Sequence, residues 1–236
     1  MIKYLFYIFL LPSLSFSEYY SQYGQDKFVN KTFFKNSRNG VFVDIGAHDG
    51  ISLSNTYFFE KELGWTGICL EPMPHVFNQL QKNRKCLCIC GCISIAEHNS
   101  THPFLQISGY PEMLSGLMDK FDPKHLSRIL YEVQEYGGSY QIIDVPCYNL
   151  NQILEDAGIN HVNFLSLDTE GGEFEILQNF DFSKCQVDVI TVEDNYRIDP
   201  FISLLADKGF EFVTSLGQDL IFVDKNLLKN LSLIHI

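Results

Sequence analysis

The ten residues 41–50, Val-Phe-Val-Asp-Ile-Gly-Ala-His-Asp-Gly, constrain the fold more than any other segment of the chain. The apolar run at 41–45 predicts a buried parallel strand, with Asp44 near its carboxyl end. Gly46 and Gly50 follow, where the chain must turn tightly into a helix, because glycine permits a positive φ and lets a ligand approach the backbone. A strand, a glycine turn and a helix N-terminus together predict a nucleotide-binding corner.

The residues around this turn favour one nucleotide over others. A phosphate-binding loop would need a lysine after its last glycine, and a dinucleotide fingerprint would need Gly-x-Gly-x-x-Gly. Here the spacing is Gly-x-x-x-Gly, and Asp44 and Asp49 flank the turn. Carboxylates repel a pyrophosphate but suit S-adenosylmethionine, which carries an ammonium and a sulfonium group and no phosphate. A nicotinamide oxidoreductase is the disfavoured alternative, opposed by Asp44 and the missing third glycine.

Strand-like and helical segments alternate along the chain, which predicts a parallel sheet covered on both faces. A final antiparallel hairpin is typical of class I methyltransferases, so we expect a Rossmann-like α/β fold with a mostly parallel seven-stranded sheet. The expected strands of the sheet are 41–45, 67–70, 87–95, 163–167 and 187–192, with the hairpin at 210–215 and 219–223, and 141–145 is expected to be an extra strand. The expected helices are part of 19–35, then 52–63, 75–83, 149–157, 173–178 and 200–208.

Length and composition limit the domain organisation. A chain of 236 residues fits one domain, which we place at residues 18–236. Within it, residues 101–138 are expected to be irregular and polar, with an amphipathic piece at 122–136. Loops of that length in a compact domain are usually functional or disordered. We therefore expect an inserted lid or substrate-facing segment there.

The first seventeen residues differ from the rest. Lys3 precedes an apolar run at 4–11, and Ser15 and Ser17 are small residues of the kind found before a cleavage site. This pattern predicts a secretory signal or an apolar anchor, because the run is too short to span a bilayer. The expected location is the secretory pathway or a membrane if the segment is a signal, and the cytoplasm otherwise. The net charge of −12 argues against nucleic-acid binding.

Acidic residues follow four of the expected parallel strands, where ligands of such sheets bind. They are Asp44, Glu71, Asp168, Glu170, Glu193 and Asp194. Glu71 lies about twenty residues beyond the glycine turn, the usual spacing for an acid that accepts both ribose hydroxyls. Asp168 is the best-placed candidate for a catalytic base. His48 is the second, because a neutral imidazole takes a proton near pH 7.

A metal site is a further hypothesis at the same edge. Asp168, Asp194 and Asn195 would offer three oxygen ligands at adjacent strand ends, which suits Mg²⁺. Four cysteines at 86, 88, 90 and 92 alternate with other residues, so on one continuous strand their thiols would share a face. We interpret them as small apolar strand residues, because a zinc site usually needs Cys-x-x-Cys.

Three motifs together resemble one known family. They are Asp-Ile-Gly-Ala-His-Asp-Gly at 44–50, Gly-Trp-Thr-Gly-Ile-Cys-Leu-Glu-Pro at 64–72 and Leu-Asp-Thr-Glu-Gly-Gly-Glu-Phe-Glu-Ile-Leu at 167–177. They are similar to the FkbM-type S-adenosylmethionine-dependent methyltransferases, over roughly residues 20–223. His48 departs from the Asn or other polar residue common there, and the four-cysteine strand departs from an Ala-rich pattern.

The resemblance implies a Rossmann-like fold and mostly O-methylation of hydroxyls on sugars or other natural products. It implies that Asp44, Gly46 and Gly50, with Ala47 between them, cradle the methionine end of the cofactor. Glu71, followed by Pro72, would hold the ribose, and residues 92–94, ending at Ser94, would lie near the adenine. Asp168 would also face the cofactor.

Besides the disfavoured nicotinamide oxidoreductase, two functions therefore remain open from sequence. The first is O-methylation of a small molecule or glycan with S-adenosylmethionine, with Mg²⁺ as an optional second cofactor. The second is a non-catalytic protein of the same fold that acts as a secretory or membrane-associated partner. Its support is the apolar N-terminus, since a lumen need not contain S-adenosylmethionine.

Overall fold

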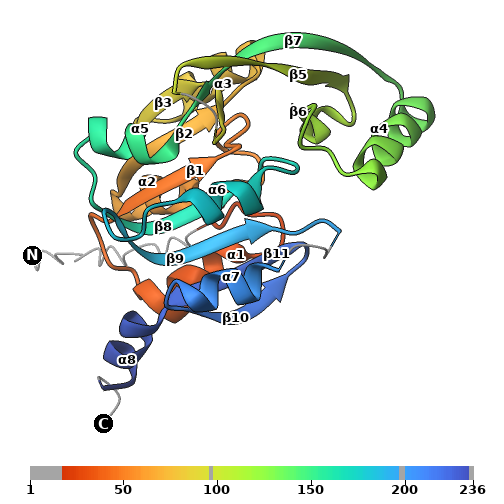
Figure 1. Cartoon of the computed structure of the whole chain (residues 1–236). Helices are drawn as coiled ribbons and strands as arrows, with labels where there is room; N and C mark the ends of the chain where they lie inside the picture. The colour runs from red at the N-terminus through yellow and green to blue at the C-terminus, as the bar shows by residue number, and fades with distance from the viewer. Residues whose placement is uncertain (1–17, 96–97, 197–199, 234–236) are drawn as a thin grey trace, which may run out of the picture.

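The computed structural model describes residues 18–95, 98–196 and 200–233, so the segment 1–17 lies outside the described residues. A seven-stranded sheet forms the centre of the molecule, in the order β10-β11-β9-β8-β1-β2-β3 (Figure 1). Five strands are parallel and the last two form an antiparallel hairpin, which confirms the predicted fold class. The strands are β1 (Val41–Ile45), β2 (Thr66–Glu71), β3 (Leu87–Cys90), β8 (His161–Leu167), β9 (Gln186–Glu193), β10 (Phe210–Leu216) and β11 (Asp219–Asp224).

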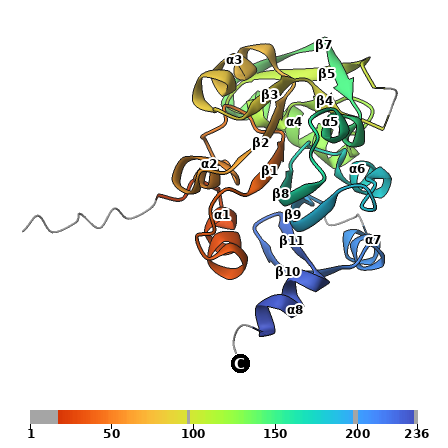
Figure 2. The ribbon, with the colours of Figure 1, turned by 90° about the vertical axis from the view of Figure 1, so that its left-hand side faces the viewer.

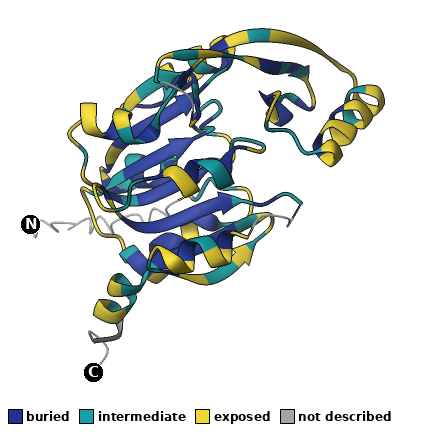
Figure 3. Cartoon of the chain, viewed as in Figure 1, coloured by how far each residue is buried: buried dark blue, intermediate teal, exposed yellow. Residues whose placement is uncertain are grey.

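Helices cover both faces of this sheet because its strands are apolar on both sides. Val43 and Ile45 face a core shared with α5 (Leu150–Asp156), α6 (Glu173–Asn179) and α7 (Phe201–Asp207). Phe42 faces the opposite core. The elements there are α1 (Gln25–Val29), η1 (Asn30–Phe34), α2 (Tyr57–Leu63), α3 (Pro74–Asn83) and α8 (Lys225–Leu233). Figure 3 shows the resulting pattern of buried strands and helices with exposed outer faces.

A second, four-stranded sheet lies beside the main one, in the order β4-β7-β5-β6 (Figures 1 and 2). Its strands are β4 (Cys92–Ile93), β5 (Ser100–Gly109), β6 (Gly116–Leu117) and β7 (Gly138–Tyr148). The 3-10 turn η2 (Glu112–Leu114) and helix α4 (Pro123–Tyr136) connect them. We call residues 100–148 the insert.

The expectation that residues 101–138 are irregular is wrong. The insert is ordered because it has a small core of its own, in which Leu105 and Ile107 of β5 pack with Leu114 and Ile129. The amphipathic piece at 122–136 is confirmed as α4, which begins after Asp122, whose side chain accepts a hydrogen bond from the Lys124 amide. The expected strand at 141–145 is confirmed within β7.

The expected strand at 87–95 divides at Gly91 into β3 and β4, which belong to different sheets. A Cβ at Gly91 would lie 2.6 Å from the carbonyl oxygen of Pro146, so only glycine fits where the chain changes sheets. Cys86 and Cys88 consequently border the core that contains Cys69. Cys92 instead packs in the core that contains Cys147. The prediction of four thiols on one face is therefore wrong.

The helix expected at 52–63 begins later, at Tyr57. Leu53 has a φ of +57°, a left-handed conformation that interrupts a helix. None of the helices in the described ranges is long and apolar enough to cross a bilayer.

Candidate active site

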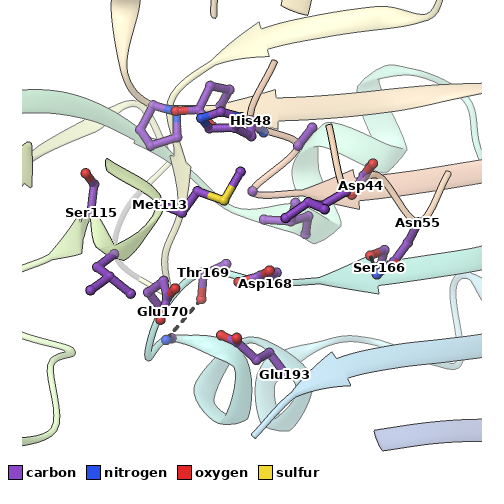
Figure 4. A pocket seen from close by; sticks show the side chains of 18 of the residues that line it. Asp44, His48, Asn55, Met113, Ser115, Ser166, Asp168, Thr169, Glu170 and Glu193 are labelled. Atoms are coloured by element: carbon purple, nitrogen blue, oxygen red, sulfur yellow. Dashed lines mark hydrogen bonds between the residues drawn. The ribbon is translucent and has the colours of Figure 1, made fainter. Parts of the chain in front are cut away.

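A cavity of about 230 Å³ opens at the carboxyl edge of the main sheet (Figure 4). Its walls come from the loops after β1, β2 and β8, from the end of β9 and from the start of β11. The insert supplies a further wall through η2 and neighbouring residues, among them Met113 and Ser115. The cavity thus lies where ligands of doubly wound sheets bind.

The loop after β1 needs its glycines. Gly46 has a φ of +83°, and a Cβ there would lie 1.7 Å from the carbonyl oxygen of Asp168. Gly50 has a φ of +82°, and a Cβ there would meet Leu80 and Arg84. The amide of Ala47, which is buried and lines the cavity, donates to the Leu70 carbonyl at 2.9 Å. This packing presses the loop against the ends of β2 and β8 and brings it to the cavity.

Asp44 lines the cavity, but its carboxylate is held by its own neighbours. It accepts hydrogen bonds from the hydroxyls of Thr56 at 2.5 Å and Ser54 at 3.4 Å. The buried guanidinium of Arg84 lies 3.8 Å away. Burial raises the pKa of Asp44, and the charge of Arg84 opposes this shift. Asp44 therefore holds Ser54, Thr56 and Arg84 together, and its direct contact with a cofactor stays a prediction.

Glu71 is buried at the end of β2 and lines the cavity next to Pro72. Its two carboxylate oxygens accept hydrogen bonds from the amides of His48 at 3.1 Å and Met73 at 2.8 Å. Burial raises its pKa to about 7, and the negative charges of Glu112 and Asp168 add to the rise. Because a carboxylate has about four acceptor positions, Glu71 can still accept from a ribose, which stays a prediction.

The part of the cavity predicted to hold the adenine differs in one residue from the expectation. Cys92 and Ile93 line the cavity, as does Gly91. Ser94 is buried, and its amide pairs with the Tyr148 carbonyl at 3.0 Å. Ser94 is not among the cavity-lining residues, so the structure does not bring it to the predicted cofactor site.

Three carboxylates meet at the ends of β8 and β9. Asp168, Glu170 and Glu193 each offer an oxygen, and these atoms lie within 4.8 Å of one another. A hydrogen bond joins the side chains of Asp168 and Glu193. Burial raises the pKa values of Glu170 and Glu193, and neighbouring carboxylates raise them further. The hydrogen bond between Asp168 and Glu193 lowers the pKa of Asp168 and raises that of Glu193, so Glu193 is the donor of the pair.

Asp168 has the properties of a general base. Its side chain is exposed to the cavity, and desolvation by the cavity walls raises its pKa to about 7. The charges of Asp219 and Glu173 add to the rise. A carboxylate with a pKa near the working pH is well matched to removing a proton in a transition state.

The residues expected to bind a metal are only partly brought together. Asn195 lines the cavity and donates to Glu170 at 2.9 Å. Asp194 is buried outside the cavity, because successive residues at the end of a strand point to opposite sides. Glu170 and Glu193 join Asp168 in its place, as the oxygens that can hold a hard cation.

His48, the second candidate base, lies in the glycine loop with a φ of +48°. Its Nε2 atom is 3.2 Å from a carboxylate oxygen of Glu112 in the insert. Figure 4 shows His48 and the Asp168–Glu193 pair on opposite sides of Met113. The contact with Glu112 holds the His48 ring away from the carboxylate cluster.

Sequence reasoning missed a polar group at the far side of the cavity. Asp219 accepts hydrogen bonds from Gln25 at 2.8 Å and Asn55 at 3.4 Å, and Asn55 also donates to Ser166. Burial raises the pKa of Asp219 to about 6. A signal existed for Asp219, since the first residue of an antiparallel strand lies at the edge where parallel strands end.

Comparison with protein-family models matches residues 44–220 to the methyltransferase FkbM domain. The chain belongs to the FkbM methyltransferase family. Comparison with curated proteins gave no match. The family assignment agrees with the geometry of the glycine loop and of Glu71. The protein is accordingly an S-adenosylmethionine-dependent methyltransferase, as sequence reasoning predicted.

Proposed function

We propose that this FkbM methyltransferase methylates a hydroxyl oxygen of a small molecule or glycan, with Asp168 as the general base. The observation that supports this proposal is the position of Asp168. Its carbonyl packs on Gly46 of the predicted donor loop, and its carboxylate faces the cavity with a pKa of about 7.

S-adenosylmethionine supplies an activated methyl group when it is bound. The residues of the protein must then hold the acceptor oxygen about 3 Å from that methyl and in line with the sulfur. The contact between Gly46 and the Asp168 backbone keeps the donor loop and the base adjacent. Asp168 accepts the hydroxyl proton, and Glu193 stabilises the carboxylate of Asp168 by donating to it.

The lining of the cavity supports a hydroxylated acceptor with an apolar part. Phe104, Met113, Leu114 and Leu117 form an apolar wall from the insert. Opposite them, the carboxylates of Asp168, Glu170 and Glu193 offer acceptors for hydroxyl groups. An acceptor that presents hydroxyls on one side and carbon on the other, as sugars do, fits both walls.

A bound Mg²⁺ would be a second way for this site to activate the acceptor hydroxyl. Asp168, Glu170 and Glu193 would hold it, since their oxygens lie close enough to share one cation. A cation lowers the pKa of a coordinated hydroxyl and so takes over the role of the base.

Transfer of a radiolabelled methyl group from S-adenosylmethionine to a panel of hydroxylated acceptors tests the proposal. We expect label in a product that resists mild alkali, because a methyl ether is stable where a methyl ester is hydrolysed. Label in an alkali-labile ester or in an N-methyl product would contradict O-methylation of a hydroxyl. Amine and carboxylate analogues of the same acceptors provide the matched controls.

A further inference from the structure

One carboxylate of the insert contacts two histidines from two other elements. Glu112, in η2, places one oxygen 3.2 Å from Nε2 of His48 and the other 2.8 Å from Nε2 of His75. His48 belongs to the glycine loop, and His75 to the first turn of α3. Glu112 therefore ties the insert to the glycine loop and to α3 at once.

This tie lies at the rim of the cavity. The side chains of His48, Glu112 and His75 are 22%, 26% and 45% exposed, so solvent reaches all three. The next residues of the same turn, Met113 and Leu114, line the cavity. The position of Glu112 thus sets how far this wall stands from the glycine loop.

The insert has other attachments, and among them Phe104 and Leu117 pack with Met73 and Val76. Lys120 pairs with Glu175 of α6 at 2.7 Å. His125 of α4 is buried, lies 3.4 Å from Glu170 and contacts the Tyr196 hydroxyl at 3.0 Å. Because His125 is buried and the Glu112 contacts are solvent-accessible, the Glu112 contacts are easier to break than those of His125.

We propose that Glu112 is a positioning residue that, with His48 and His75, latches η2 over the donor loop and gates the entry and exit of S-adenosylmethionine. The inference rests on the proposed function, since it takes the glycine loop to be the donor site. Opening the latch frees the exposed side chain of Met113 to move away from that loop, while Leu114 stays packed in the core of the insert. Closing it returns Met113 to its position over the bound donor.

The first test measures the association and dissociation rates of S-adenosylmethionine by stopped flow in Glu112→Ala. We expect both rates to rise about three- to tenfold while the affinity changes less than about threefold, because the gate is lost and the donor contacts remain. The lost negative charge alone would slow the approach of a cationic ligand, so a faster association separates gating from electrostatics. An unchanged or slower association rate would overturn the proposal.

Two further variants sharpen this test. His75→Ala leaves the charge of Glu112 in place and breaks one of its two contacts, so we expect both rates to rise by a smaller factor. Glu135→Ala removes an exposed carboxylate from α4 of the same insert and should leave both rates unchanged. If Glu135→Ala accelerates binding as much as Glu112→Ala does, the proposal that Glu112 acts as a latch is wrong.

Hydrogen exchange of the free protein gives a readout that needs no donor. The amides of Leu114 and Ser115 donate to the carbonyls of Pro111 and Glu112 within the latched turn. In Glu112→Ala we expect these amides to exchange at least about threefold faster, and unaltered exchange would overturn the latch. Failure of the wild-type protein to bind S-adenosylmethionine would instead refute the proposed function, so the two failures are distinguishable.

Discussion

The two ends of strands β8 and β9 carry carboxylates in opposite situations. At the amino ends, Asp188 accepts hydrogen bonds from Asn163 at 2.7 Å and Gln186 at 3.1 Å, and His161 lies 2.9 Å away. At the carboxyl ends, Asp168 is grouped with further carboxylates, and its pKa rises to about 7. The same pair of strands thus has a satisfied polar network at one end and mutually repelling acids at the other.

This difference separates structural from functional carboxylates. An acid surrounded by donors stabilises the fold, whereas a cluster of desolvated acids costs stability and persists where chemistry needs it. Burial alone does not make the distinction, because Asp188, Glu71 and Glu173 are all buried. The partners of each carboxylate decide its role.

The largest expected effect is on catalysis at the carboxyl ends. Asp168→Asn keeps the shape of the side chain but cannot accept a proton, so methyl transfer should fall by about 10²- to 10⁴-fold. Its affinity for S-adenosylmethionine, measured by calorimetry, should change less than about threefold. A rate within tenfold of wild type would exclude Asp168 as the base.

At the amino ends, the expected effect is on stability. Asp188→Ala removes the acceptor of three partly or fully exposed donors and should lower the free energy of unfolding by about 1 kcal/mol, measured by urea denaturation. Asp207→Ala, at an exposed position in α7, should change it by less than about 0.5 kcal/mol. Donor affinity should be unaltered in both variants, and its loss in Asp188→Ala would contradict a purely structural role.

The same Asp168→Asn variant should gain stability at pH 7.5, by about 1 kcal/mol after allowance for solvent in the cavity. The sign follows from the raised pKa: the folded state binds the proton more tightly than the unfolded state, so ionised Asp168 destabilises the fold. The gain should shrink as the pH falls from about 7 towards 4, where both states become protonated. Thermal unfolding across this range measures it, and a gain that grows on acidification would contradict the assignment.

The smallest effect should come from removing divalent cations. If Asp168 acts as the base, thorough chelation should change the rate of methyl transfer by less than about threefold. A loss of tenfold or more that added Mg²⁺ restores would instead support the metal arrangement at Asp168, Glu170 and Glu193.

Local sequence patterns predicted the main sheet because each strand carries its own signal. The apolar run at 41–45 and the hairpin around Gly217 required no knowledge of distant residues, and both are confirmed. The insert was harder, because its order depends on contacts such as those of Leu105 and Ile107 with Ile129, which lie more than twenty residues apart. The break at Gly91 likewise depends on the distant carbonyl of Pro146.

The sequence predicted those residues of the candidate site that directly follow a strand, because the ends of the parallel strands place them at the cavity. Asp168 and Glu71 follow strands directly, and the structure places both at the cavity. The sequence pattern did not reveal that the Asp44 carboxylate pairs with Arg84, because these residues lie forty positions apart in the chain. The contact of Glu112 with His48 was hidden for the same reason.

Calorimetric titration of S-adenosylmethionine into the wild-type protein and two glycine variants tests the central claim most directly. Gly46→Ala would place a Cβ 1.7 Å from the Asp168 carbonyl, whereas Gly158→Ala has a similar positive φ but open space around its Cβ. We predict one donor bound per wild-type chain, binding retained in Gly158→Ala, and affinity reduced at least about a hundredfold in Gly46→Ala. No binding by the wild type, or equal binding by both variants, would contradict the account.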